Sequence, residues 1–190
     1  MFNIMLDPVP EDWEGYPINS DFRVGIQVHQ IMEDTELTKE EKYLKAMDLI
    51  FPGVRPDIED QIRAISWFLS GWNHDNHKGE KDSIRVIDYD IDQWRLYAAF
   101  KSQYGIDLNK DDMHYWQFMG LLTTLDECAF TRVVDIRMKK ITSKMPKEEK
   151  AATLRAKKIY GLDQRQETEE QKQKQQEAIE IFEKMRKAQS

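Results

Sequence analysis

The feature that most constrains the fold is the stretch from Asp88 to Leu125, which holds two aromatic-rich helical patterns separated by a short turn. In the first pattern, apolar side chains recur every three or four residues and share one helical face; they are Ile91, Trp94, Tyr97, Ala98 and Tyr104. Asp90 is a candidate N-cap for this helix, and Gly105 is its expected end. The second pattern, over residues 115–122, is apolar around most of its circumference, which favours a central helix.

These aromatic side chains allow two interpretations. They are either the core of an antiparallel helix pair or a stacking platform for bases or a cofactor. Proteins that stack single-stranded bases interleave exposed aromatic side chains with basic ones, whereas buried aromatic side chains dominate the energetics of cores. Because the aromatic residues here follow a helical period, we expect a packed core.

Apolar spacing predicts helices in the rest of the chain as well. A helix over about residues 21–34, capped by Ser20 or Asn19, would carry Val24, Val28 and Ile31 on one face. Thr38 and Glu41 match a capping box, so a second helix should begin there and end at Pro52-Gly53. A third helix, opened by Asp57, would bury one continuous stripe, formed by Ile58, Ile62, Ile65, Leu69 and Trp72. Two more are expected. One carries Phe130, Val133, Val134 and Ile141, whose β-branched residues leave a strand as the alternative, and the other runs from Pro146 to Tyr160.

The two ends of the chain differ from its centre. Phe2, Ile4 and Leu6 alternate like a short strand, and residues 13–18 suggest a hairpin with Gly15 at the bend. The last part, residues 162–190, is rich in Gln, Glu and Lys and is either a solvated helix or disordered until a partner binds. We therefore predict a mainly α protein: one compact multi-helix domain over residues 1–161, with a short β or extended segment over residues 1–18, and a polar tail over residues 162–190.

Composition limits the classes of function. The formal net charge of −7 and the pI near 5.2 argue against binding to nucleic acid, which requires clustered Lys and Arg. No apolar run approaches the roughly 20 residues of a membrane span, and no signal peptide is expected. The single cysteine, Cys128, excludes an intramolecular disulfide and favours a reducing, cytosolic compartment.

Four groups of residues could carry chemistry, and each has a simpler interpretation. His74 and His77 form H-x-x-H, which zinc can use, but an exposed polar loop explains the same spacing. The Asp88, Asp90 and Asp92 series begins like a calcium loop, yet it lacks the required glycine and glutamate and fits acidic residues at a helix start. Cys128 has acidic rather than basic neighbours, and His114 fits a satisfied core or boundary histidine better than an acid or base. We therefore expect no enzyme, cofactor or metal.

Basic residues gather late in the chain, where they suggest a solvated amphipathic face or, as the alternative, a surface for an acidic partner. They are Arg132, Arg137, Lys139, Lys140, Lys144, Lys147, Lys150, Arg155, Lys157 and Lys158. Three apolar side chains near the end of the tail are the candidate partner-binding residues: Ile179, Phe182 and Met185.

Several sequence blocks resemble the phage family named after gene product fifteen, whose members occur in tailed phages and prophages of Gram-positive bacteria. The blocks run in order from about Leu6 to Tyr160; they are residues 18–23, Trp67-Phe68 before Gly71, the Asp88–Asp92 series, residues 97–100, residues 103–108 and residues 114–118. Two features depart from the family: Tyr115-Trp116 stands where a paired Trp is expected, and the Gln-rich end after Leu162 is an extension.

The resemblance implies a non-enzymatic protein of the tail-morphogenesis module, similar in gene position to tail assembly chaperones. Such chaperones bind the long helical tape-measure protein, keep it soluble and help to recruit tube subunits. The implied partners are the tape-measure protein and the major tail protein, with no nucleic acid and no membrane; a homo-oligomer is compatible with this role. The implied place of action is the host bacterial cytoplasm during phage assembly. The alternative is a structural component of the tail or virion.

Overall fold

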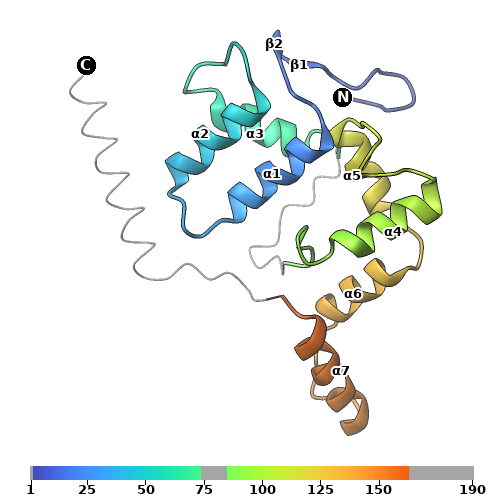
Figure 1. The fold of residues 1–190 in the computed structure, drawn as a ribbon. Coiled ribbons are helices and arrows are strands. Elements are labelled where there is room, and N and C mark those ends of the chain that lie inside the picture. Colours follow the sequence, from blue (N-terminus) through green and yellow to red (C-terminus); the bar gives the residue numbers. More distant parts are fainter. Residues whose placement is uncertain (1, 74–84, 163–190) are drawn as a thin grey trace. The chain divides into compact units, whose positions relative to one another are not determined.

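The computed structural model describes residues 2–73 and 85–162, and these residues form two short β-strands and seven helices (Figure 1). The strands make one antiparallel hairpin near the N-terminus, and almost all other regular structure is helical. The prediction of a mainly α fold with a small N-terminal hairpin is confirmed.

Contacts divide the chain into two compact units. Unit 1 comprises the described residues 2–73 and 113–119, with β1 (Asp12–Trp13), β2 (Tyr16–Pro17), α1 (Phe22–Glu33), α2 (Lys39–Ile50), α3 (Gln61–Ser70) and the first part of α5 (Tyr115–Thr123). Unit 2 comprises the described residues 85–112 and 120–162, with α4 (Gln93–Tyr104), the end of α5, α6 (Ala129–Met138) and α7 (Lys147–Tyr160). The single domain predicted for residues 1–161 stays a prediction.

The N-terminal hairpin forms where turn residues allow it. Trp13 pairs with Tyr16 across the two strands, and Gly15 takes a positive φ of 88°, which glycine adopts without steric cost. The strand predicted over Phe2, Ile4 and Leu6 is wrong. The backbone N–H groups of Leu6 and Asp7 both donate to the Asn3 carbonyl, at 2.9 and 2.8 Å, so this segment closes into a turn.

Local capping chemistry determines where the first helices begin. Asp21, rather than Ser20 or Asn19, caps α1, because its carboxylate accepts a hydrogen bond from the Arg23 amide at 2.7 Å. The capping box predicted at Thr38 is confirmed, with the Glu41 carboxylate 2.8 Å from the Thr38 amide. Figure 1 shows α1, α2 and α3 packed side by side, in agreement with their mutual contacts.

The stripe predicted for the third helix is wrong in its start, and only its later part, which includes buried Ile65, faces the core. Helix α3 begins at Gln61, after a turn over residues 57–60, and it buries Ala64, Ile65 and Phe68. Ile58 and Ile62 are 60% and 52% exposed. Fully buried Phe68, which the predicted stripe omitted, stacks on Tyr115 with ring centroids 5.1 Å apart, and this contact shifts the buried face of α3 toward Ala64 and Phe68 and away from Ile62.

Residues 113–119 complete the core of unit 1. The Phe22 amide donates to the Met113 carbonyl at 2.9 Å, and the Tyr115 amide donates to the Ser20 carbonyl at 2.7 Å. Tyr115 is fully buried, and a Cβ added at Gly25 would lie only 1.9 Å from its ring. Glycine at this position is therefore what lets the aromatic ring approach the backbone of α1.

In unit 2, α4 packs against α6. The antiparallel pair of α4 and α5 stays a prediction, because most of α5 belongs to unit 1. Its buried residues are Leu96, Ala99 and Phe100, whereas Ile91 and Trp94 are 59% and 75% exposed. Helix α4 also begins after Asp92, so Asp90 is not its N-cap. The aromatic side chains of α5 are core residues as predicted, with Tyr115, Trp116 and Phe118 all buried.

Candidate functional site

The surface of unit 1 carries a groove of about 460 Å³ between α1 and α2. Gln27, Gln30 and Ile31 line it from α1, Asp34 lines it from the C-cap that follows α1, and Lys45, Asp48 and Leu49 line it from α2. Together with Asp34, the α1 residues are three and four positions apart, so they project from one helical face over about two turns. We call this feature the α1–α2 groove.

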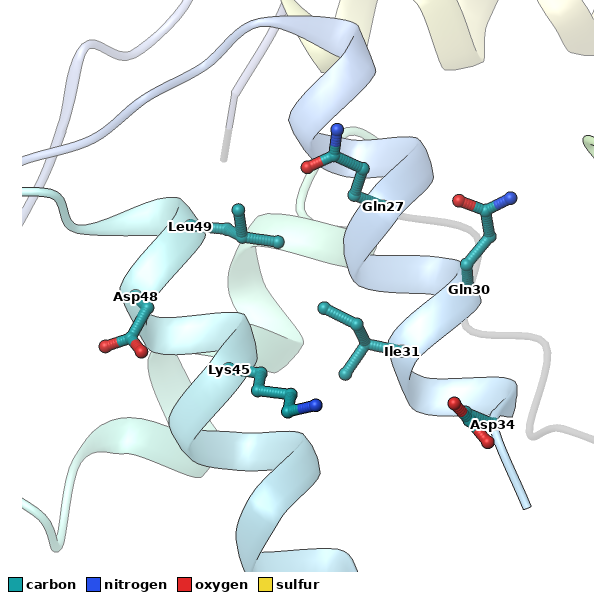
Figure 2. A pocket seen from close by; sticks show the side chains of 7 residues that line it. All are labelled: Gln27, Gln30, Ile31, Asp34, Lys45, Asp48 and Leu49. Atoms are coloured by element: carbon teal, nitrogen blue, oxygen red, sulfur yellow. The ribbon is translucent and has the colours of Figure 1, made fainter. Parts of the chain in front are cut away.

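Apolar side chains form the centre of the α1–α2 groove and polar ones its margins. Figure 2 shows Ile31 and Leu49 pointing toward each other from the two helices, and Lys45 extending from α2 toward α1. Both apolar residues are half-buried, so part of each remains open to contact. An apolar centre with a polar margin is the arrangement by which grooves accept an amphipathic helix.

The charges at the margin are anchored locally. Asp48 pairs with Arg55, and the Asp34 carboxylate accepts a hydrogen bond from the Glu36 amide at 2.8 Å. Both side chains of the Asp48–Arg55 pair are exposed, at 58% and 43%, so this ion pair is worth little to stability and can exchange partners.

A second exposed apolar feature lies on α4 in unit 2. Trp94 is 75% exposed, and Tyr97 contacts its ring edge-on at a centroid distance of 6.0 Å. Ile91, three residues before Trp94, is 59% exposed. Large aromatic side chains at the surface are the residue type that dominates binding energy in protein interfaces.

The Asp88–Asp92 series that resembled a calcium loop is part of a buried ion-pair network. Arg137 is 4% exposed, and its guanidinium donates to both carboxylate oxygens of fully buried Asp92, at 2.5 and 3.1 Å. Arg137 also donates to the carbonyls of Val86 and Tyr160, each at 2.8 Å. Asp88 pairs with Arg85 at 2.6 Å. The network joins the start of α4, α6 and the end of α7, which assigns it to structure.

Two histidines in unit 1, buried His114 and half-buried His29, are also satisfied by protein groups. His114 Nε2 lies 2.9 Å from the Pro10 carbonyl, and its Nδ1 accepts the Trp116 amide proton at 3.0 Å. His29 Nε2 lies 2.6 Å from the Tyr115 hydroxyl. Burial lowers the pKa of both imidazoles, against smaller opposing contributions from Glu33 at His29 and from the Pro10 carbonyl and Glu11 at His114. The interpretation of His114 as a satisfied core histidine agrees with this geometry.

The sequence profile of the family described as "Bacteriophage Gp15 protein" matches residues 5–162. That match covers most of the chain, including every helix in the two units. The chain belongs to the bacteriophage Gp15 family. No curated protein and no solved structure matches this Gp15 family member.

Five of the other candidate residues of this Gp15 protein lie outside the described part of the chain. They are His74, His77, Ile179, Phe182 and Met185. Within residues 2–73 and 85–162, no group of three or more His, Cys, Asp or Glu side chains is arranged to hold a metal ion. The same residues include no helix long and apolar enough to cross a membrane. Cys128 is a half-buried free thiol at the start of α6.

The α1–α2 groove was not predicted from the sequence of the Gp15 protein. Ile31 was assigned to the core face of its helix, and nothing marked Leu49 or Lys45 as its neighbours. The only sequence signal for the groove was the extent of the apolar face of α1. Ile31 continues this face past fully buried Val28. Arg137 was likewise assigned to a solvated basic face, and that assignment is wrong.

Proposed function

We propose that this Gp15 family protein is a non-enzymatic phage tail assembly protein, a chaperone that binds the tape-measure protein in the host bacterial cytoplasm during tail morphogenesis. Family membership over residues 5–162 supports a phage role. The assembly role is supported by the gene position that the family resemblance implies, which is similar to that of tail assembly chaperones. The α1–α2 groove is the observation that carries the proposal, since it offers a place for a helix.

The chemistry of the groove suits a tape-measure segment. A tape measure is a very long, largely helical chain, and its apolar stripes would aggregate unless covered. The half-buried side chains of Ile31 and Leu49 can contact one such stripe, while Gln27, Lys45 and Asp34 can meet the polar residues beside it. This contact covers apolar surface of the partner without requiring a deep pocket.

The test is co-expression with the tape-measure protein encoded by the same phage. The native chain should raise the soluble fraction of the tape measure and co-purify with it. The double variant Ile31→Gln, Leu49→Gln should lose both effects, because it makes the centre of the groove polar. Ile58→Gln, Ile62→Gln is the matched control, since these residues are exposed apolar side chains elsewhere in unit 1.

Three outcomes decide this test. Loss of co-purification in the groove variant alone supports the proposal. Absence of any complex with the native chain contradicts the chaperone role. Equal binding by the groove variant and its control contradicts the groove as the site. Circular dichroism of each variant checks that the helices are retained.

A structural component of the tail or virion is the second candidate function. The exposure of Trp94 and Ile91 favours it, because large apolar side chains at a surface suit permanent burial against other subunits. Mass spectrometry of purified particles separates the two functions. A structural component should be present in a fixed ratio to the major tail protein, whereas a chaperone should be absent or far below it.

A further inference from the structure

The outward face of α7 combines a small apolar centre with a basic margin. Ala151 and Leu154 lie three residues apart on this face, and Leu154 is 51% exposed. Four exposed cations surround them: Lys147, Lys150, Arg155 and Lys158. The opposite side of the helix is the packed one, where Thr153 is buried and Lys157 donates to the Arg137 carbonyl at 2.6 Å.

The pattern on this α7 face favours an acidic protein surface over a phosphate-rich one. Contacts to nucleic acid come mainly from cations that neutralise phosphates, and an apolar side chain at the centre of the face adds nothing to them. A helix that lies on a membrane needs a broad apolar face, which Ala151 and Leu154 do not provide. An apolar centre framed by cations fits a groove with an apolar floor and acidic edges.

This chain offers such a groove. Acidic residues outnumber basic ones by more than two to one among the described residues of unit 1, whereas basic residues are in excess in unit 2. The α1–α2 groove has Ile31 and Leu49 at its centre, and the residues that line it include two carboxylates, Asp34 and Asp48, against one cation, Lys45. Asp48 also pairs with Arg55 in an exposed ion pair that can exchange partners. Opposite charge on two surfaces of one chain favours the approach of two copies in a head-to-tail orientation.

We propose that α7 of one copy docks into the α1–α2 groove of a second copy. Leu154 contacts Ile31 and Leu49, and the cations around it face Asp34 and Asp48. Lys147 and Lys158 lie about 10 Å and about 6 Å along the helix axis from Leu154, so they reach the ends of a groove that spans about two turns. The contact is heterologous, because each copy uses its α7 face for one neighbour and its groove for another.

This self-association rests on the α7 face and the groove and does not depend on the tape measure. If both proposals hold, α7 of a second copy occupies the groove until a partner helix displaces it. Because the test below uses the chain alone, its failure would leave the proposed function intact, and failure of the co-expression test would leave the self-association intact.

Sedimentation velocity of the full chain tests the contact, at about 0.1 M and about 1 M NaCl, between which the Debye length falls from about 10 Å to about 3 Å. The native chain should associate in a concentration-dependent manner at the lower salt and about tenfold more weakly at the higher salt. The variant Lys147→Glu, Lys150→Glu should be monomeric. These substitutions lie in the first turn of α7, where acidic residues favour the helix.

The reciprocal variant, Asp34→Lys, Asp48→Lys, should also be monomeric, and mixing the two variants should restore association because both pairs of surfaces become complementary again. Two controls change the net charge by the same amount at other exposed positions. They are Lys140→Glu, Lys144→Glu and Asp57→Lys, Glu59→Lys, and both should associate like the native chain. A native chain that stays monomeric, a mixture that fails to associate, or a control that dissociates would each overturn the proposal.

Discussion

Arg137 and Asp92 form a bidentate ion pair inside unit 2, where Asp92 is fully buried and Arg137 is 4% exposed. The carboxylate also accepts hydrogen bonds from Arg95 at 2.9 Å and from the Asp88 amide at 3.1 Å. Each nitrogen and oxygen atom of the two charged groups therefore has a hydrogen-bond partner. A buried ion pair is tolerated under this condition.

Arg137→Met should destabilise the chain by about 3–5 kcal/mol, because it leaves Asp92 buried without its main counter-charge. Urea unfolding followed by circular dichroism measures this loss. Lys139→Met is the control. Lys139 pairs with Glu149 at the surface, and this ion pair should contribute less than about 1 kcal/mol to the free energy of unfolding.

The double variant Arg137→Met, Asp92→Leu separates the ion pair from simple packing. Removing both charges should recover part of the loss, because no uncompensated carboxylate remains. Recovery should stay incomplete, since the Val86 and Tyr160 carbonyls lose their donor. A double variant that is less stable than Arg137→Met alone would contradict this account.

Gly25→Ala should destabilise the chain by about 3 kcal/mol, because the added methyl group would lie 1.9 Å from the Tyr115 ring in a fully packed core. Gly120→Ala is the matched control. Gly120 is also helical but has open space around the added carbon, so alanine there should stabilise by about 0.5–1 kcal/mol. Thermal melts of both variants should therefore shift in opposite directions, and a neutral Gly25→Ala would contradict the close contact.

Stability should fall as the pH decreases below about 6.5, the ordinary histidine pKa. Burial lowers the folded-state pKa of His29 and His114, so the unfolded chain binds protons more readily than the folded one in this range. The stabilisation that comes from keeping these two histidines neutral is fully present above the histidine pKa of the unfolded chain. It is lost progressively as the pH falls toward the lower pKa of the folded chain. Each unit of difference between the two pKa values corresponds to about 1.4 kcal/mol.

Urea unfolding between pH 7.5 and 5.5 measures this dependence, at pH values chosen to bracket the ordinary histidine pKa of about 6.5. His29→Gln removes one titrating group while keeping an atom that can bind the Tyr115 hydroxyl, so its stability should vary less with pH than that of the native chain. An unchanged pH dependence in this variant would show that His29 does not contribute.

Features determined by neighbouring residues could be predicted from the sequence. The capping box at Thr38 and Glu41 involves groups three residues apart, and the bend of the hairpin involves only the adjacent residues Glu14 and Gly15, which both take a positive φ. Both are confirmed. The start of α7 after Pro146 also follows a local pattern, as does the burial of Tyr115 in a helix that is apolar on most sides. The end of α6 does not, because α6 stops at Met138 and leaves out Ile141, which was predicted to belong to it.

The buried face of α4, and part of the buried face of α3, could not be predicted in this way. A helical period gives the spacing of apolar residues but leaves open which of two competing faces is buried. On α3 the choice depends on the stacking of Phe68 against Tyr115, a residue 47 positions later in the chain. Arg137 lies in a run of basic residues, and only its contact with distant Asp92 distinguishes it. The α1–α2 groove could not be predicted either, because its two sides come from separate helices.

A chain that ends at Leu162 should keep the fold of both units, because the family match also ends there and the described contacts of α7 lie within residues 85–162. Its thermal midpoint should equal that of the full chain. Binding to the tape measure should weaken if Ile179, Phe182 and Met185 contact the partner, and replacing these three residues by Ser in the full chain should weaken binding equally. A fall in the thermal midpoint on truncation would instead assign the three apolar side chains to the core, and unchanged binding would remove them as partner contacts.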